Sequence, residues 1–129
     1  MRLLLDTHLL LWAVAEPQHL DAVTRAALEA ADNEVLFSAA SIWEIAIKAR
    51  LGRPDFAFRP EEILDAALKS DFVELPVRAR AATLVAGLPL HHRDPFDRLL
   101  IAQAISEPVR LYTADPLLPP YSELVTLVG

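Results

Sequence analysis

Short apolar runs recur along the chain, and helix-like segments separate them. The runs are Arg2–Leu5, Glu34–Phe37, Phe72–Leu75 and Val109–Tyr112, with Leu124–Leu127 a candidate last one. The first four stop at a polar residue or a proline, which is typical of short buried strands. Strands that alternate with helices predict a parallel sheet with right-handed crossovers and helices on both faces. We therefore expect an α/β fold, a three-layer α/β/α sandwich with a parallel central sheet.

The segments between these runs have apolar residues at helical spacing or begin with helix-starting residues. The predicted helices are Leu9–Ala15, Asp21–Ala31, Ala39–Arg50, Pro60–Ser70, Ala79–Ala86 and Pro95–Ser106. Gly52 and Pro54 end the third of these, and Pro60 opens the fourth. We find no internal repeat and no linker.

The length and composition favour one domain spanning residues 1–129. A chain of 129 residues with 53% hydrophobic residues can bury a core but is short for two domains. The absence of cysteine excludes a disulfide framework, a thiolate nucleophile and a cysteine-based metal site. Asp6 and His8 interrupt the apolar start that a signal peptide would need, and no run is long enough to span a membrane. We expect a cytoplasmic protein.

The net charge of −6 argues against a broad basic surface for nucleic acid. A nucleic acid would have to be held locally. If several of the acids formed a metal site, bound divalent cations would offset part of the negative charge. The charge balance therefore disfavours a DNA clamp but remains compatible with a metal-dependent nuclease.

Acidic residues that are far apart in the sequence are expected at one edge of the sheet. Asp6 directly follows the first strand, Asp115 follows the Val109–Tyr112 strand, and Asp94 and Asp97 open the helix before that strand. Glu44 lies about two turns into the helix after the second strand. In parallel α/β folds, ligands bind at the carboxyl ends of the strands.

Clustered carboxylates repel one another and are costly to desolvate unless a cation compensates. Oxygen ligands without cysteine or paired histidine suit a hard ion such as Mg²⁺ or Mn²⁺. Such an ion polarises a phosphoryl oxygen and lowers the pKa of a bound water. The reaction class that this predicts is phosphodiester hydrolysis.

Helix capping is an alternative explanation for Asp6 and Glu44. Asp6 stands where an N-cap of the first helix is expected, and capping alone would explain it as well as catalysis does. Ser41 and Glu44 have the spacing of a capping box. Ser38 offers an earlier start to that helix, which would leave Glu44 without a capping role.

Capping also explains the other aspartates when each is taken singly. Asp94 before Pro95 is a good N-cap, Asp97 would then face the helix dipole, and Asp115 before Pro116 repeats the pattern. Considered alone, Asp94 and Asp115 are better explained as caps. Five acids at one edge are harder to explain in this way.

Several neighbouring residues have more than one interpretation. His8, His91 and His92 lack the spacing of a helical zinc pair, so we expect polar or loop roles. Arg93 and Arg98 flank the acids and would contact either a substrate phosphate or the carboxylates themselves. Basic residues that line a phosphate groove or end a solvated helix are Lys48, Arg50, Arg53 and Arg59.

The run from Leu9 to Trp12 offers more apolar surface than one face of a short helix needs. We expect part of it to form a partner groove or a dimer contact. Trp12 and Trp43 are better explained as core or partner contacts than as platforms for base stacking.

Four stretches in the right order resemble PIN-domain ribonucleases, and among them the VapC toxins of toxin–antitoxin pairs. They are LLLDTHLLLW, SAASIWEIAIK, HHRDPFDRLLIAQA and LYTADPLL, which together cover nearly the whole chain. The resemblance places the acids of the family on Asp6, Glu44, Asp97 and Asp115, with Asp94 as a further candidate ligand. The proline-rich PLLPPY after Asp115 departs from the family pattern.

The resemblance implies Mg²⁺- or Mn²⁺-dependent cleavage of RNA, a homodimer and inhibition by a small VapB-like antitoxin. It implies that Asp6 and Asp97 are the primary metal ligands, and that Glu44 and Asp115 bind metal through water or orient the nucleophile. Thr7 and Thr113 would support them with hydroxyl groups. Two other classes remain, another small α/β phosphohydrolase and a binding module whose acids are only helix caps. A phosphatase of the haloacid dehalogenase type would need an aspartate where this chain has His8.

Overall fold

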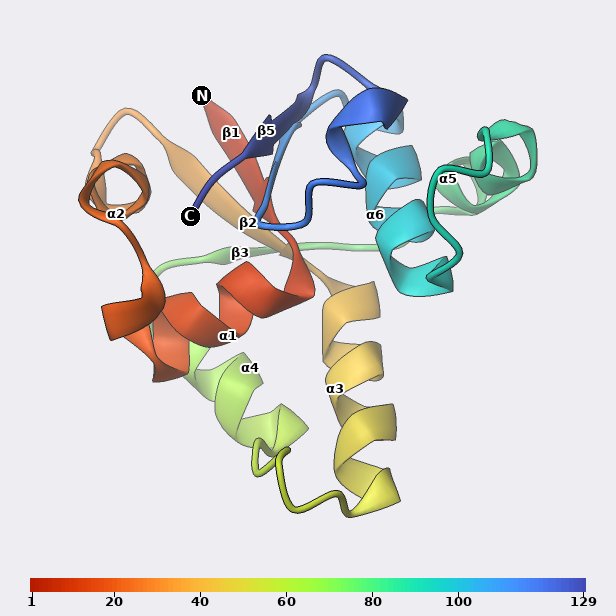
Figure 1. The fold of residues 1–129 in the computed structure, drawn as a ribbon. Coiled ribbons are helices and arrows are strands. Elements are labelled where there is room, and N and C mark those ends of the chain that lie inside the picture. The colour runs from red at the N-terminus through yellow and green to blue at the C-terminus, as the bar shows by residue number, and fades with distance from the viewer.

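A five-stranded parallel sheet forms the centre of the computed structural model, which describes residues 1–129 (Figure 1). Its strands are β1 (Arg2–Leu5), β2 (Glu34–Ser38), β3 (Val73–Leu75), β4 (Arg110–Thr113) and β5 (Val125–Leu127). The strand order is β3-β2-β1-β4-β5, and every neighbouring pair is parallel.

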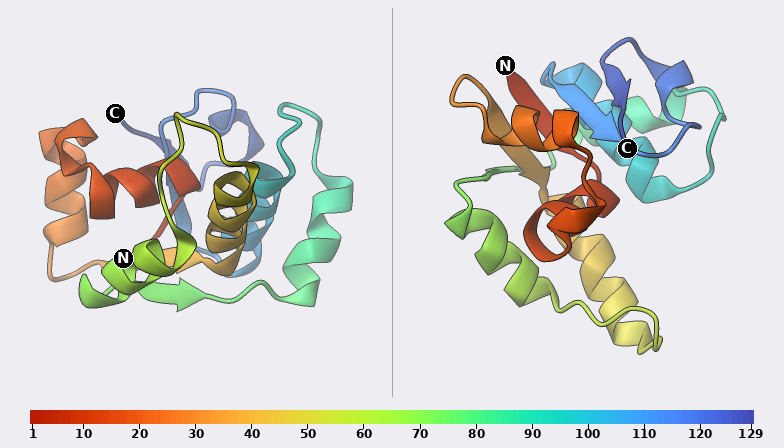
Figure 2. Two further views of the ribbon diagram at one scale, coloured as in Figure 1. Left: turned by 90° about the horizontal axis from the view of Figure 1, so that it is seen from below. Right: turned by 60° about the vertical axis from the view of Figure 1, so that its left-hand side comes forward.

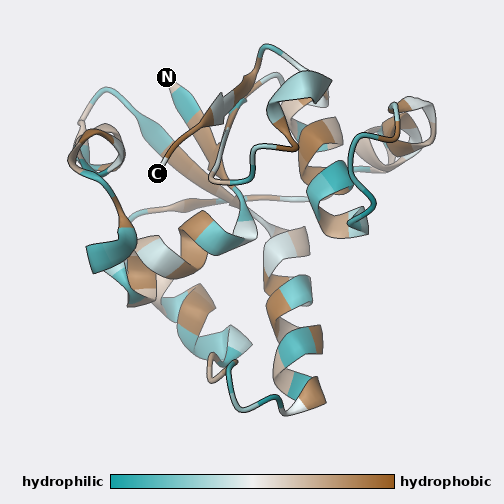
Figure 3. Cartoon of the chain, viewed as in Figure 1, coloured by the Kyte–Doolittle hydropathy of each residue, from teal (hydrophilic) through white to brown (hydrophobic).

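Six α-helices connect the strands. They are α1 (Thr7–Ala15), α2 (Ala22–Glu29), α3 (Ala39–Leu51), α4 (Pro60–Lys69), α5 (Ala79–Leu84) and α6 (Pro95–Ser106). Short 3₁₀ turns lie at Pro17–His19, Val85–Gly87 and Pro119–Tyr121. Figure 3 shows the helices banded in brown and teal, as expected for helices that turn only one side toward a core.

Alternation along β1 divides the core between the two faces of the sheet. Leu3 and Leu5 are fully buried in the cluster that holds residues of α1 and α4, whereas Leu4 is buried in the cluster that holds residues of α6. Successive side chains of a strand point to opposite faces. Figure 2 shows the same division, with α1 and α4 on one side of the sheet and α6 on the other. The predicted three-layer α/β/α sandwich is confirmed.

The predicted elements are all present, with small shifts at their ends. α1 begins at Thr7, two residues before the predicted start, because Asp6 caps it. The fourth strand lies one residue later than predicted, at Arg110–Thr113. The predicted helix Ala79–Ala86 ends at Leu84 and continues as a 3₁₀ turn.

The strand order places a topological switch point between β1 and β4. β2 and β3 extend the sheet on one side of β1, and β4 and β5 extend it on the other. Crossover connections leave β1 and β4 in opposite directions at such a point, which opens a crevice at the carboxyl ends of the two strands. Asp6 follows β1 and Asp115 follows β4, so both stand at this crevice.

The apolar surface expected on the first helix is mostly used within the chain. Leu9, Leu10 and Leu11 are buried in the core against β1, β2 and α4. These three leucines therefore cannot form a partner surface, and Trp12 is the one residue of the run that remains partly exposed for such a contact. No helix combines the length and apolarity needed to cross a bilayer.

Candidate active site

Asp6 both caps α1 and lines the crevice. Its Oδ1 accepts a hydrogen bond from the Leu9 amide (2.8 Å), and its Oδ2 accepts one from the Thr113 hydroxyl (2.6 Å). The side chain is buried, and this desolvation raises its pKa, although both hydrogen bonds oppose the rise. Asp6 is thus a rigid carboxylate whose negative charge a nearby cation would stabilise.

Asp94 and Asp97 have different roles at the start of α6. Asp94 is the N-cap, and its Oδ1 accepts from the amides of Phe96 (2.8 Å) and Asp97 (3.1 Å). Pro95 occupies the first helical position, as expected. The Asp97 carboxylate caps nothing and contacts only His92, with Oδ2 3.1 Å from its Nε2.

Burial raises the pKa of Asp97 to about 7, and the charges of Asp94, Asp6 and Glu44 add to the rise. His92 opposes it. A carboxyl whose pKa is raised this far is partly protonated at neutral pH. A cation among these acids would remove the repulsion and hold Asp97 in its charged form.

Asp115 reaches the same cavity through a turn after β4. Its amide donates to the Thr113 hydroxyl (3.0 Å), and its Oδ1 accepts from the Leu117 amide (2.9 Å). Its Oδ2 lies 3.1 Å from His92 Nε2. No α-helix follows, so the expected cap of a helix is wrong and Asp115 instead closes a tight turn.

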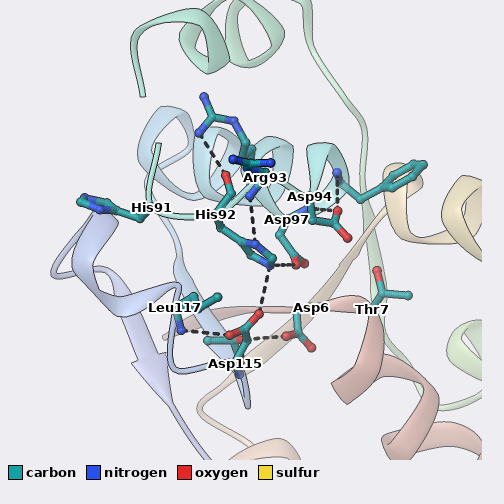
Figure 4. A network of polar contacts seen from close by, with 12 residues as sticks. Asp6, Thr7, His91, His92, Arg93, Asp94, Asp97, Asp115 and Leu117 are labelled. Carbon is teal, nitrogen blue, oxygen red and sulfur yellow. Dashed lines mark hydrogen bonds and ion pairs between the residues drawn. The ribbon is translucent and has the colours of Figure 1, made fainter. Parts of the chain in front are cut away.

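His92 joins the two carboxylates (Figure 4). Its Nε2 lies between Asp97 and Asp115, and its Nδ1 accepts from the Arg93 amide (3.0 Å). The sequence predicts only a polar or loop role for His92, because no spacing pattern links it to Asp115.

Glu44 is held behind the cavity by neighbours on α1 and α3. Its Oε1 accepts from the Thr7 hydroxyl (2.7 Å), which also lies 2.9 Å from the Ser41 hydroxyl, and its Oε2 pairs with Lys48 Nζ (2.8 Å). Ser38 caps α3 through the Ala40 amide. The capping-box explanation is therefore wrong for Glu44, and the expected support by Thr7 and Thr113 is present.

A cavity of about 450 Å³ unites most of the predicted acids. The acids that line it are Asp6, Asp94, Asp97 and Asp115, together with His8, Trp12 and His92. Glu44 does not line it, yet its charge raises the pKa of both Asp6 and Asp97. The structure thus brings four acids together and leaves the fifth beside them.

The donor set fits a divalent cation. One ligand atom from each of His92, Asp97 and Asp115 lies within 4.8 Å of the others, and Asp6 lines the same cavity. Carboxylate oxygens are the ligands that hard divalent ions prefer, and the raised pKa values of Asp6 and Asp97 indicate that positive charge is lacking there.

Arg98 does not pair with the carboxylates as one of its two sequence interpretations expected. Arg98 points away from the carboxylates and donates to backbone carbonyls of the 85–92 segment and to the Tyr121 hydroxyl. Pairing with the acids is therefore wrong for Arg98, whereas contact of Arg93 or Arg98 with a substrate phosphate stays a prediction. Of the other basic residues, Lys48 pairs with Glu44 and Arg59 with Glu61.

Comparisons with known proteins agree with this geometry. Residues 3–119 match the PIN domain family. The chain is 35% identical over 115 residues to Ribonuclease VapC22 of Mycobacterium tuberculosis (strain ATCC 25618 / H37Rv). The matched region covers 87% of this chain and 85% of that protein.

Two solved structures share the fold. VapBC2 from Rickettsia felis, bound to a DNA fragment from its promoter, aligns with a TM-score of 0.72, 16% identity and full coverage of both chains. FitAcB from Neisseria gonorrhoeae aligns with a TM-score of 0.58 and 17% identity, covering 98% of this chain and 96% of that one. With the family match over residues 3–119, the likeness to a ribonuclease and the acidic cavity at the switch point of the sheet, this chain belongs to the PIN domain family.

Proposed function

We propose that this chain is a metal-dependent endoribonuclease and the toxin of a toxin–antitoxin pair, acting in the cytoplasm as a single domain of residues 1–129. The observation that carries the proposal is the pair of carboxyls at one cavity, the buried Asp6 and the partly buried Asp97, whose pKa values are both raised. The 35% identity to a VapC ribonuclease supports the choice of RNA as substrate.

The proposed cofactor is Mg²⁺ or Mn²⁺. We assign Asp6 and Asp97 as its primary ligands, and Asp115 and Glu44 as acids that act directly or through water. Asp94 is a weaker candidate ligand because its Oδ1 already accepts two amide hydrogen bonds. When bound, such a cation polarises a phosphoryl oxygen and lowers the pKa of a coordinated water.

The residues of the chain hold the acids in fixed positions for this chemistry. Thr113 and the Leu9 amide fix both oxygens of Asp6. Thr7 and Lys48 fix both oxygens of Glu44. Fixed carboxylates need little reorganisation when charge develops on the phosphate, which is the advantage of a preorganised site.

Helix capping alone does not account for the site. Asp97 and Glu44 are largely buried and cap no helix, because Asp94 and Ser38 perform that role on α6 and α3. Asp97 in particular has no basic partner other than His92, so in a pure binding module its partly buried charge would be destabilising. This favours the enzyme over the module.

The proposed partners are a VapB-like antitoxin, an RNA substrate and a second copy of the chain. The aligned Rickettsia felis structure is a VapBC2 complex, and FitAcB is a second aligned structure. The nearly complete coverage of both chains supports a similar assembly here.

The deciding experiment compares Asp97→Asn with Asp94→Asn. We expect Asp97→Asn to remain folded, to lower RNA cleavage by about 10² or more and to weaken Mn²⁺ binding, because it removes the charge that holds the cation. Asp94→Asn keeps the capping oxygen, so it should change RNA cleavage and Mn²⁺ binding much less. RNA cleavage and Mn²⁺ titration calorimetry are measured on both proteins. An Asp97→Asn protein that cleaves RNA as well as the parent would sink the proposal.

A further inference from the structure

Arg98 holds the segment that precedes the site. Its Nη1 donates to the Pro89 carbonyl (2.9 Å) and the Tyr121 hydroxyl (3.1 Å), and its Nη2 donates to the carbonyls of Val85 (3.1 Å) and Leu88 (3.3 Å). A guanidinium offers five N–H donors in a fixed plane, against the three donors of a lysine ammonium, so it can hold this set of acceptors in place as a lysine could not. Arg98 thus holds the main chain of the 85–92 segment in place through its hydrogen bonds.

Tyr121 also holds the 85–92 segment, through hydrogen bonds to its last two residues. Its hydroxyl accepts from the amides of His91 (3.0 Å) and His92 (2.8 Å) and lies 3.2 Å from the His92 carbonyl. The main chain of His92 is therefore fixed by hydrogen bonds to the Tyr121 side chain, which belongs to the turn after β4. Arg98, which holds the same segment, follows Asp97 directly on α6.

The fixed main chain determines where the His92 ring stands. Its Nδ1 accepts from the Arg93 amide, so the ring proton lies on Nε2, which is 3.1 Å from both Asp97 Oδ2 and Asp115 Oδ2. Nε2–H therefore donates toward two carboxylates that come from different elements. With its proton in place, Nε2 donates to the two acids, so only the carboxylates of the cluster His92, Asp97 and Asp115 remain as metal ligands in this arrangement.

We propose that Arg98 and Tyr121 are positioning residues that hold His92 as a hydrogen-bond donor to Asp97 and Asp115, and so set the separation of these two acids. The inference rests on the proposed function, because it concerns the same acids. Arg98 follows Asp97 and Tyr121 belongs to the segment after Asp115, so the network ties both acids to the 85–92 segment. The proposal gives a common structural role to the HHR stretch before Asp94 and to the PLLPPY stretch after Asp115.

The test uses Tyr121→Phe, which removes the hydroxyl oxygen and keeps the aromatic ring. This ring packs against the His91 ring, with 4.9 Å between the ring centroids. We expect the Mn²⁺ dissociation constant to rise roughly tenfold and kcat to fall by a similar factor, with KM nearly unchanged, as for other residues that orient metal ligands. The ¹⁵N shifts of the His92 imidazole should move away from those of a fixed Nε2–H ring. Tyr112→Phe is the matched control, because Tyr112 on β4 is the other tyrosine and its hydroxyl takes no part in this network.

A double-mutant cycle separates positioning from general loosening of the fold. His92→Ala keeps the backbone groups that Tyr121 and Arg98 contact and removes only the ring. If Tyr121 acts through His92, adding Tyr121→Phe to His92→Ala should weaken Mn²⁺ binding no further. Additive losses in the double variant would overturn the proposal. So would a Tyr121→Phe protein with parental Mn²⁺ affinity and His92 shifts.

These readouts are distinct from the test of the proposed function. If the parent protein binds Mn²⁺ but cleaves no RNA, the ribonuclease proposal fails while the cycle on Mn²⁺ affinity still decides the role of Tyr121. If Tyr121→Phe does not fold, Arg98→Lys replaces it, and it is expected to produce the same loss of affinity because it breaks the carbonyl contacts of the guanidinium.

Discussion

At the level of single residues, capping a helix and lining the acidic cavity are not exclusive roles. Asp6 uses one oxygen for the Leu9 amide and the other for Thr113, and still faces the cavity. Asp97 has no such partners apart from His92, and its pKa is raised to about 7. The acid with the fewest partners is therefore the one whose charge depends most on a bound cation.

The raised pKa of Asp97 predicts how stability varies with pH. Between about pH 4, near its ordinary pKa, and about pH 7, the folded protein keeps a proton that the unfolded chain has lost, so the free energy of unfolding of the metal-free protein should fall as pH rises. Above about pH 7 this contribution should be constant. Mn²⁺ must displace the proton, so its stabilisation of the fold should be larger at about pH 8 than at about pH 6.

Thermal melting with and without Mn²⁺ at the two pH values measures this effect. Asp97→Asn is the control, because its side chain has no proton for Mn²⁺ to displace. Its melting temperature should therefore change little on addition of Mn²⁺ at either pH. A parent protein whose Mn²⁺ stabilisation is equal at the two pH values would contradict the assignment of Asp97 as a ligand.

The sequence predicts the acids but not the residues that arrange them. Asp6 and Asp115 can be placed because each lies within two residues of the end of a strand in a parallel sheet, and Asp97 because it lies in the first turn of a helix. His92 and Arg98 act through a loop whose conformation depends on backbone hydrogen bonds with Tyr121, about 30 residues away in the chain. No local pattern encodes such contacts.

At the level of elements, two buried residues that hydrogen-bond to each other, Ser38 and Gln103, connect the end of β2 and the start of α3 to α6. Ser38 caps α3 through the Ala40 amide (3.0 Å), and its hydroxyl donates to Gln103 Oε1 (2.5 Å) on α6. Gln103 Nε2 in turn donates to the Pro76 carbonyl (3.3 Å) after β3. Ser38 and Gln103 are both fully buried. This pair fixes the start of α3, and with it Glu44, relative to the helix that carries Asp97.

Ser38→Ala should destabilise the protein by about 1–3 kcal/mol, because it removes a helix cap and leaves Gln103 Oε1 buried without a donor. Ser70→Ala is the control, since the Ser70 hydroxyl bonds only to the Ala66 carbonyl at an exposed helix end. We expect a change within about 0.5 kcal/mol for the control. Urea denaturation of both variants gives the comparison, and equal effects would show that the buried pair contributes nothing.

The elements themselves are well predicted because most strands and helices end at capping residues or prolines. Ser38, Asp94 with Pro95, and Pro60 mark boundaries that the structure reproduces. The strand order could not be predicted, because it depends on which faces of the helices cover the sheet and not on any local signal. The site position followed only from the parallel arrangement, which places all carboxyl ends at one edge.

For the whole molecule, one continuous stripe of exposed apolar side chains lies on α3 and not on the first helix. Trp43, Ile47 and Leu51 are 61%, 39% and 59% exposed, and their spacing of four residues puts them along one side of α3. Figure 1 shows α3 projecting from the edge of the sheet. Trp43 also packs edge-on against Phe96 beside Asp97, at 5.3 Å between ring centroids. A homodimer formed through this side would lie close to the acidic cavity.

We predict that Ile47→Glu converts a dimer into a monomer, because an unpaired carboxylate buried at an apolar contact costs several kcal/mol. Ile105→Glu is the matched control, since Ile105 on α6 is 38% exposed, almost as much as Ile47, but lies outside the α3 stripe. Light scattering at several concentrations measures the mass of the parent and both variants. A parent that stays monomeric at high concentration would contradict the homodimer, and a dimer that survives Ile47→Glu but dissociates with Ile105→Glu would move the contact to α6.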